Sequence, residues 1–472
     1  MADNQPAQKT VVFRSAAYDV VVIGAGPAGM AAAVAAARQG VTVALLDEQR
    51  DVGGQIYRGI QNAPSDRMEI LGPDYGTGAT LAAQFAASGA RHITHAAVWQ
   101  VTTDRQVHYL QSGSVRSIQA GRIVLCTGAM ERPFPIPGWT LPGVMTAGAA
   151  QILLKGSGMT PAQPAVLAGC GPLLYLLGWQ YVRAGVKIAA IVDTTDGADY
   201  RRAIRHAGGA LAGWSYLKKG LMLMTSLRKA GVRFYHGATD LRVLGDGQAS
   251  GLGFSCNGQA HQVTSPVVLL HQGVVPNTQF SWSLRARHEW NDAQLCWVPV
   301  TDAWGELGVD GIFVAGDGRG IGGAVVAALQ GELAGLAAAT QLGRMSARER
   351  DRLAEPLRAE MRKHLFIRPF LDALYRPKKE NRIPADTTVV CRCEEVTAGE
   401  IRHFVRIGCT GSNQVKSYGR CGMGPCQGRQ CGLTVTEVIA YARGVPPEEA
   451  GYYRIRPPIK PITLGELANE AK

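Results

Sequence analysis

The stretch that decides the fold is YDVVVIGAGPAG, residues 18–29. Its first half is an apolar, β-branched run that predicts a buried parallel strand. Its second half places Gly24, Gly26 and Gly29 in a G-x-G-x-x-G pattern, in which the glycines allow a tight turn, a close approach of the backbone to a pyrophosphate, and close packing of helix on strand. An alanine-rich run and a second apolar strand ending at Asp47 follow. Because a carboxylate at that distance accepts hydrogen bonds from ribose hydroxyls, the stretch predicts a dinucleotide site.

Three later stretches resemble motifs of flavoproteins with two dinucleotide-binding domains. DVGGQIY at 51–57 resembles their Gly-Gly-Gln loop, and VLCTGAMERPFPIPG at 124–138 resembles their A-T-G strand and turn. GIFVAGD at 311–317 resembles the C-terminal motif whose aspartate contacts the ribityl–phosphate part of FAD. Their order along the chain favours FAD as the cofactor. The predicted FAD contacts are Gly24, Gly26, Pro27, Ala28, Gly29, Asp47, Glu48, Gly54, Gln55, Thr127, Gly128, Gly316 and Asp317.

A second strand–turn–helix–strand unit occupies residues 164–193 and departs from the motif at one position. Its first two glycines are Gly169 and Gly171, but Leu174 stands where the third is expected, and a leucine there pushes the helix away from the strand. Asp193 remains available for a ribose. The unit is therefore predicted to hold NAD(P), another adenine nucleotide, or no nucleotide.

A chain of 472 residues is too long for a single core. The predicted fold class is α/β: a flavoprotein with two dinucleotide-binding domains, the second inserted in the first, followed by a small helical cysteine-rich domain. The expected ranges are 15–150 and 269–345 for the FAD-binding domain, 151–268 for the inserted NAD(P)-like domain, 346–385 for a helical arm, 386–455 for the cysteine-rich domain and 456–472 for a tail.

Two pairs of cysteines near the end of the chain predict a metal site. Cys391 and Cys393 form C-x-C, and Cys421 and Cys426 form C-x4-C, which is the pattern of a four-thiolate site. Sulfur ligands suit zinc or iron. We favour a [2Fe–2S] cluster because it can exchange electrons with a flavin. Cys431 lies near enough in sequence to leave the last ligand open between Cys426 and Cys431.

Charge and hydropathy narrow the class of partner and the location. The net charge of +12 indicates either an anionic partner, such as a phosphate cofactor or an acidic surface, or a basic surface without a partner. No nucleic-acid-binding motif is present, so nucleic acid is not expected. The start of the sequence lacks an export signal, and the most apolar later stretch, 321–340, contains Gln330 and Glu332 and is expected to be a buried helix. A cytoplasmic location is expected, with no transmembrane segment and with peripheral association at the inner membrane left open.

The motifs and the cysteine module together resemble the FAD-containing alpha (A) subunits of multi-subunit bacterial dehydrogenases. These are the octopine/nopaline oxidase, hydroxyproline or proline dehydrogenase and hydrogen cyanide synthase types, and the segments that carry the resemblance are DEQRDVGGQIYR at 47–58, TGAMERPFPIPGW at 127–139 and the cysteine module. The resemblance implies an FAD-dependent enzyme subunit that transfers electrons. The amino acid, imino acid or opine would be oxidised on an FAD-containing, amino-acid-oxidase-like beta subunit, and a small gamma subunit is left open. No catalytic residue is predicted on this chain.

Two further resemblances concern the cysteine region. Residues 386–450 are similar to bacterioferritin-associated-ferredoxin [2Fe–2S] domains, which usually end in C-x-x-C, so the C-x4-C spacing is a departure. QVKSYGRCGMGPCQGR at 414–429 resembles a segment of sarcosine oxidase alpha subunits, whose complexes hold FMN at a subunit interface. This resemblance implies that Lys416 and Arg429 contact an FMN phosphate.

Two other functions compete with this interpretation. A stand-alone NAD(P)H-dependent flavin/iron–sulfur oxidoreductase would need nucleotide binding in the second unit, where Leu174 argues against it. A redox-sensing or scaffold protein would bind the same cofactors without turnover.

Overall fold

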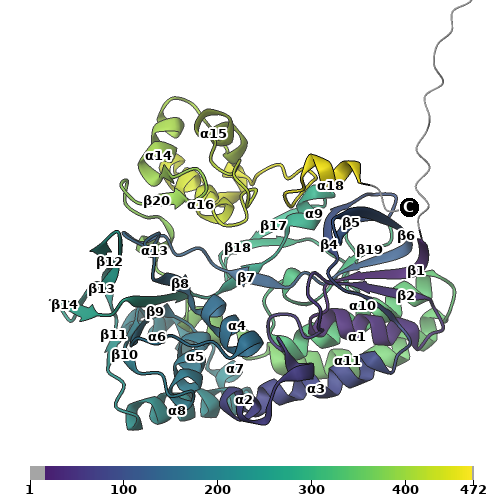
Figure 1. The fold of residues 1–472 in the computed structure, drawn as a ribbon, viewed down its shortest axis with the longest axis horizontal. Helices are drawn as coiled ribbons and strands as arrows, with labels where there is room; N and C mark the ends of the chain where they lie inside the picture. Colours follow the sequence, from purple (N-terminus) through teal and green to yellow (C-terminus); the bar gives the residue numbers. More distant parts are fainter. Residues whose placement is uncertain (1–15, 470–472) are drawn as a thin grey trace, which may run out of the picture.

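The structure, a computed structural model, describes residues 16–469. Two α/β units lie side by side, and a small cysteine-bearing module sits above them in Figure 1. The predicted fold class is confirmed.

The first unit is built on a seven-stranded sheet that the chain enters twice. Strands β3, β2, β1 and β6 are parallel neighbours, β5 and β4 extend the sheet in antiparallel fashion, and β19 also pairs with β6. Because β19 comes after the second unit in the sequence, the first unit is discontinuous. The strands are β1 (Ala16–Ile23), β2 (Val43–Leu46), β3 (Arg91–Ile93), β4 (Ala97–Val101), β5 (Gln106–Gln111), β6 (Ser114–Leu125) and β19 (Ile312–Val314).

Two helices pack against each other beside this sheet: α1 (Pro27–Ala37) and α10 (Ala324–Gln341). A Cβ at Gly331 would lie 2.0 Å from the carbonyl oxygen of Ala28, so only glycine allows this approach. Helix α10 is the apolar stretch expected to be buried, and most of its residues are buried. Its Gln330 accepts a hydrogen bond from the Gly316 backbone N–H at 3.0 Å, which explains a polar residue within an apolar helix.

The second unit has a five-stranded parallel sheet in the order β11-β10-β9-β15-β8. This sheet starts at Val144 and ends at Gln272, so it reaches past both ends of the expected 151–268 range. A three-stranded antiparallel sheet, β12–β14, packs beside it. The elements are β8 (Val144–Thr146), α4 (Ala147–Ser157), β9 (Ala165–Cys170), α5 (Pro172–Arg183), β10 (Ile188–Asp193), α6 (Gly197–Ile204), α7 (Ala207–Ala212), α8 (Trp214–Lys229), β11 (Phe234–His236), β12 (Thr239–Asp246), β13 (Gln248–Cys256), β14 (Gln259–Thr264) and β15 (Val267–Gln272).

A helical arm links the flavoprotein units to the module. Helix α11 (Ala347–Leu365) packs along α10, and α12 (Arg368–Leu374) packs on α6 of the second unit. The break between these two helices falls at residues 366–367, and Pro369 lies in the first turn of α12, where a proline is tolerated. The elements that follow α12 are α13 (Lys379–Arg382), β20 (Val389–Cys391), β21 (Val396–Thr397), α14 (Ala398–Arg406), α15 (Ser412–Gly419), α16 (Gly432–Arg443), α17 (Pro447–Ala450) and α18 (Leu464–Ala468).

The tail returns to the first unit, where the Val115 N–H donates to the Asn469 carbonyl oxygen at 3.2 Å. Within residues 16–469, none of the helices combines the length and the apolar character needed to span a bilayer.

Candidate flavin and cysteine sites

The three glycines of the first motif occupy the positions that a pyrophosphate-binding turn needs. A Cβ at Gly24 would lie 2.3 Å from the Cys126 carbonyl oxygen, and one at Gly29 would lie 1.8 Å from the Gly24 carbonyl oxygen. At Gly26, by contrast, the nearest atom to an added Cβ is the Gly54 Cα at 3.8 Å. The space over Gly26, at the N-terminus of α1, is therefore open, and such a helix end attracts phosphate.

Two acids follow β2, and their roles differ. Asp47 accepts hydrogen bonds from the N–H groups of Ala25, at 2.6 Å, and Gln49, at 2.8 Å, so its carboxylate is held beside the glycine turn. Glu48 is paired with Lys460 of the tail. Burial lowers the pKa of Lys460 to about 8, although the Asp47 charge opposes the shift. Nothing local in the sequence points to Lys460, because its partner lies about 400 residues earlier.

The other predicted FAD contacts border the same end of the sheet. Gly128 and Thr127 are hydrogen-bonded to the backbone of Asn277, with the Thr127 Oγ1 donating at 3.0 Å. Asp317 accepts hydrogen bonds from the N–H groups of Gly322, at 2.9 Å, and Gly323, at 3.0 Å, and so holds the turn that leads into α10. The donors and the open turn fit the phosphates and ribose of FAD.

A buried lysine that sequence reasoning missed lies beside the Gly-Gly-Gln loop. Lys155 Nζ donates to the Gln151 Oε1 at 2.9 Å and to the Gln55 carbonyl oxygen at 3.3 Å. Burial and the nearby Arg58 guanidinium lower the pKa of Lys155 to about 7. The predicted strand-and-helix pattern offers no signal for a buried cation at this position.

The second dinucleotide unit is filled by side chains of the chain itself. The His271 Nε2 lies 3.1 Å from where a Cβ on Gly171 would be. The imidazole therefore fills the space over Gly171, whereas the corresponding space over Gly26 in the first unit is open. Asp193 is fully buried; it accepts a hydrogen bond from the Tyr175 hydroxyl, and its other oxygen accepts one from the Thr195 N–H at 2.8 Å. Both carboxylate oxygens are therefore already engaged within the protein.

The arm covers the same edge of the second unit. The Cys170 thiol of the glycine turn donates to the Tyr375 carbonyl oxygen at 3.5 Å. Burial and the nearby Asp193 carboxylate raise the pKa of Tyr375. Lys378 Nζ forms ion pairs with Asp196 at 2.8 Å and with Asp199 at 2.5 Å. Residues 375–378 thus lie across the end of the sheet where a nucleotide would enter.

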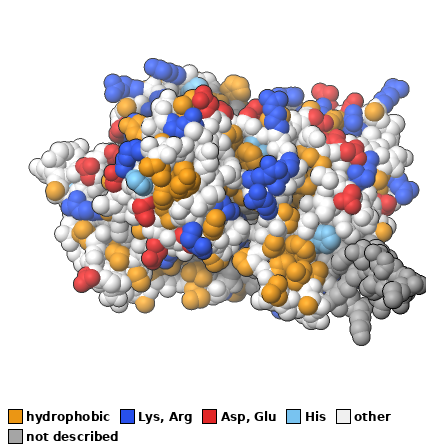
Figure 2. Space-filling model, turned by 90° about the horizontal axis from the view of Figure 1, so that it is seen from above, with side chains coloured by type: hydrophobic (Ala, Val, Ile, Leu, Met, Phe, Trp, Pro, Cys, Tyr) orange, Lys and Arg blue, Asp and Glu red, His pale blue; other side chains and the backbone are white. Residues whose placement is uncertain are grey.

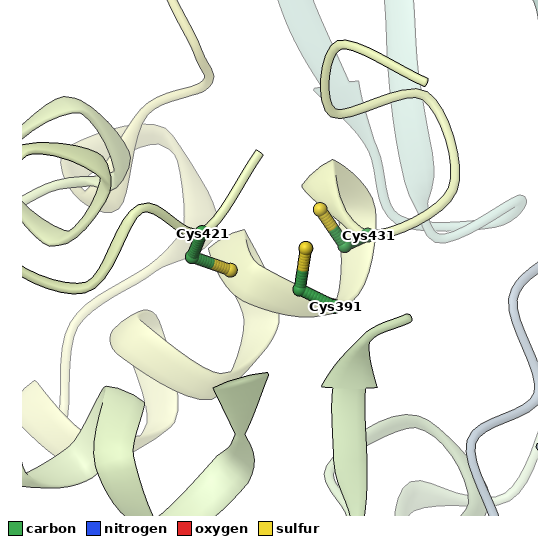
Figure 3. A group of neighbouring side chains, drawn as sticks. All are labelled: Cys391, Cys421 and Cys431. Atoms are coloured by element: carbon green, nitrogen blue, oxygen red, sulfur yellow. The ribbon is translucent and has the colours of Figure 1, made fainter. Parts of the chain in front are cut away.

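Three cysteine thiols of the module converge in its interior. The sulfur atoms of Cys391, Cys421 and Cys431 lie within 4.8 Å of one another, and all three residues are buried. Figure 3 shows the three side chains directed into one small space. Cys391 ends β20, Cys421 follows α15, and Cys431 precedes α16. The sequence left the last ligand open between Cys426 and Cys431, and of these two it is Cys431 that lies in the buried group.

The remaining two predicted ligands lie beside each other next to this group. Cys393 is exposed and is hydrogen-bonded to both the backbone and the side chain of Cys426. A Cβ at Gly424 would lie 2.3 Å from the Cys393 Cβ, so the glycine allows the C-x-C turn to meet the C-x4-C loop. The structure thus brings Cys391 together with Cys421, and Cys393 together with Cys426, while Cys393 and Cys426 lie outside the buried group of three.

The electrostatics of the group favour a thiolate at Cys391. Hydrogen bonds from Cys421 and Cys431, with further ones from the backbone N–H groups of Gly422 and Glu394, lower the pKa of Cys391 to about 2. Donating to that thiolate raises the pKa of Cys421 to about 12 and raises the pKa of Cys431 well above its ordinary value. Backbone donors to sulfur are typical of sites that hold metal through cysteine.

The two cations predicted to hold an FMN phosphate have different partners in the structure. Lys416 Nζ is 5.8 Å from the centre of the Tyr453 ring. Arg429 donates to the Ile459 carbonyl oxygen at 3.2 Å and borders a small cavity between the module and the first unit, with Gln279 and Trp297. Figure 2 views the molecule from the module's side, where Lys and Arg side chains gather near the middle of the face beside apolar patches.

In comparisons with known proteins, two family models match separate parts of the chain. Residues 18–331 match the pyridine nucleotide-disulphide oxidoreductase family, and residues 385–471 match the sarcosine oxidase A3 domain. The fold is similar to that of L-proline dehydrogenase from P. horikoshii, with a TM-score of 0.70 and 19% identity over 97% of this chain and 80% of that one.

Two curated relatives span almost the whole chain. The chain is 44% identical to the opine oxidase A subunit of Agrobacterium tumefaciens (strain Ach5), over 96% of this chain and 92% of the relative. It is 29% identical to the HcnB subunit of hydrogen cyanide synthase from Pseudomonas aeruginosa, over 95% of this chain and 98% of the relative. The chain belongs to the family of opine oxidase A subunits, and its two α/β units belong to the pyridine nucleotide-disulphide oxidoreductase family.

Proposed function

We propose that this chain is the electron-transferring FAD subunit of a hetero-oligomeric oxidoreductase that oxidises an opine. The observation that carries the proposal is the 44% identity to the opine oxidase A subunit over nearly the full length of both chains. The open glycine turn at Gly26, with Asp47 and Asp317 beside it, supports FAD binding. When bound there, FAD would supply the electron-transfer chemistry.

Oxidation of the substrate itself takes place on a partner subunit in this proposal. The relatives are named as subunits of larger enzymes, and this supports an obligatory partner. A beta subunit with its own FAD, and a small gamma subunit, remain predictions. An FMN at the interface, with Lys416 and Arg429 near its phosphate, also remains a prediction. The Arg429 guanidinium supports it, because its hydrogen bond goes to a backbone carbonyl and leaves the positive charge available.

The module holds a [2Fe–2S] cluster in this proposal. Cys391, Cys393 and Cys421 supply three ligands, and either Cys426 or Cys431 supplies the fourth. The support is geometric: Cys391 contacts both Cys421 and Cys431, and Cys393 contacts Cys426. The N–H groups that point at the Cys391 sulfur would also stabilise a negatively charged cluster.

Single alanine variants, with iron content and visible circular dichroism as readouts, test the ligand set. We expect Cys391→Ala, Cys393→Ala and Cys421→Ala each to lose the iron while FAD stays bound. Only one of Cys426→Ala and Cys431→Ala should do the same. Cys409→Ala is the matched control, because Cys409 is buried in the same module outside the group. Zinc in place of iron in the native chain would contradict the cluster.

The rival function, a stand-alone NAD(P)H-dependent oxidoreductase, has less support. It needs a nucleotide in the second unit, where His271 fills the turn and Asp193 is buried and bonded.

The experiment that tests the proposed function is co-expression of this chain with its partner subunits, followed by anaerobic addition of an opine. We expect the flavin bands of this chain to bleach only when the partner is present. Reduction by opine without a partner would place the oxidation site on this chain and contradict the proposal.

A further inference from the structure

One segment of the second unit is rich in positive charge and contains no acidic residue. Residues 200–233 contain eight Lys and Arg residues and no Asp or Glu, whereas the whole chain has an excess of twelve positive charges. The segment covers the end of α6 together with α7, α8 and the turn after α8. The cations are Arg201, Arg202, Arg205, Lys218, Lys219, Arg228, Lys229 and Arg233.

The same segment exposes large apolar side chains. Leu211 is 76% exposed, and Trp214 and Leu221 are each 58% exposed. Helix α8 buries only Leu223 and Leu227. At 100° per residue, Trp214 and Leu221 share the side of α8 that is opposite this buried pair. Exposed aromatic and aliphatic groups gathered in this way mark an interaction surface.

Most of the cations around these apolar groups have no carboxylate partner. Lys219 is paired with Asp74, and Arg202 is paired with Asp199. In the part of the chain that the structure describes, no acid lies within ion-pair distance of Arg205, Lys218 or Lys229. Six of the eight cations thus have no ion pair within residues 16–469, and the surface is both apolar and positively charged.

This face is separated from the cysteine module. Helix α8 lies along the lower edge of the molecule in Figure 1, whereas α14, α15 and α16 lie at the top. A ligand or surface bound at α8 would leave the module and the flavin units free to meet a partner subunit.

We propose that residues 200–229 dock onto a membrane surface that is rich in anionic lipid. A helix with Trp and Leu on its outer side and Lys and Arg around them lies in the headgroup layer with its apolar side chains inserted. Each nearby cation adds attraction to anionic headgroups, and lysines can extend their charged ends to the headgroups while their stems stay in apolar surroundings. An acidic protein fits less well, because the cores of protein interfaces are depleted in Lys, and Lys218 lies beside Leu221 here.

This inference goes beyond the proposed function and does not depend on it. It assigns a location to the chain through a surface that is remote from the cysteine group. It also gives a role to a segment whose eight cations have no acidic residue among them in the sequence.

Co-sedimentation of the holo chain, alone and assembled with its partner subunits, tests the proposal. The probes are vesicles of phosphatidylethanolamine with phosphatidylglycerol and vesicles of phosphatidylcholine alone. We expect binding to the anionic vesicles, loss of this binding at high salt, and little binding to phosphatidylcholine. The double variant Lys218→Ala/Lys229→Ala should weaken binding about 30-fold, and Leu221→Glu should abolish it. Both variants should retain FAD, because the changed residues are exposed.

Matched controls come from other exposed positions. Leu464→Glu changes a leucine that is 84% exposed on α18, and Arg348→Glu reverses an exposed cation on α11; both should bind vesicles as the native chain does. Absence of binding to anionic vesicles overturns the proposal, and so does equal binding by the α8 variants and the controls. Binding by the isolated chain but not by the assembled complex also overturns it, because the face would then be a subunit interface.

Discussion

Gly26 and Gly171 hold the same place in two copies of one motif, yet their surroundings differ. Space is open over Gly26, whereas the His271 ring fills it over Gly171. The sequence predicts both turns correctly, because the glycine spacing is local. It does not predict His271, which comes from a strand 100 residues later in the chain. What occupies a turn depends on long-range packing, and a motif contains no information about it.

Gly26→Ala separates the fold from the cofactor. A methyl group there meets nothing closer than 3.8 Å in the protein, so we expect the melting temperature of the FAD-free chain to be unchanged. The same methyl group would occupy the approach of a pyrophosphate. FAD affinity should therefore fall about tenfold or more, which corresponds to about 1.4 kcal/mol, as measured by FAD titration into the apo chain.

Gly29→Ala is the contrasting variant, since its Cβ would lie 1.8 Å from the Gly24 carbonyl oxygen. We expect this change to destabilise the fold itself. Unchanged FAD affinity in Gly26→Ala would mean that the pyrophosphate does not lie over this turn.

Lys155 makes stability depend on pH. Its folded-state pKa is about 7, whereas an unfolded lysine titrates near 10.4. Below about pH 7 both states are protonated and the full cost of burying the charge is present. From about pH 7 to pH 10 the unfolded chain binds the extra proton, so the native chain gains stability as the pH rises.

Lys155→Met removes this dependence. We expect the variant to be the more stable chain below about pH 7 and to lose that advantage by about pH 10, a swing on the order of 5 kcal/mol. Denaturant unfolding at a series of pH values measures it. Lys187→Met, at an exposed lysine, should show no such swing. A pH-independent difference for Lys155→Met would mean that the buried amine keeps its proton.

At the scale of elements, the arm fixes the module to the flavoprotein units. Arg382 of α13 forms an ion pair with Glu437 of α16, and both side chains are largely buried. Removing one partner of a buried pair leaves an uncompensated charge, which typically costs about 3–5 kcal/mol. We therefore expect Arg382→Met to loosen the module, with faster proteolysis of the arm and of residues 386–455, while FAD stays bound.

The double variant Arg382→Met/Glu437→Leu is the internal control, because it removes both charges. It should restore most of the protection against protease. If Arg382→Met alone leaves the module fully protected, the ion pair does not hold the module in place.

The sequence predicts the helices of this arm but not its path. Charged composition and Pro369 indicate a helical connector with a break. That Tyr375 and Lys378 lie across the second unit could not be predicted, because their partners Cys170, Asp196 and Asp199 are about 200 residues away. The cysteine site is similar in this respect: the spacing predicts pairs of thiols, and only the fold shows that Cys431 packs against Cys391.

At the scale of the whole molecule, one fold contains an open dinucleotide site and a closed one. The sequence raised doubt about the second site through Leu174 alone. The structure adds His271 in the turn, engaged oxygens on Asp193, and the arm at the entrance. These obstacles come from three separate parts of the chain, so a single substitution would not reopen the site.

A titration of the native holo chain with NADH under anaerobic conditions tests this closure. We expect the flavin bands to stay oxidised, whereas dithionite should bleach them in the same sample. NADH, NADPH and ATP should also leave the melting temperature unchanged. A nucleotide that did bind, at 100 times its Kd, would add about 2.7 kcal/mol to the unfolding free energy and raise the melting temperature. A thermal shift without bleaching would mean that a nucleotide binds but does not deliver electrons. Rapid bleaching by NADH would mean that His271 and the arm move aside, and this chain would then be a reductase in its own right.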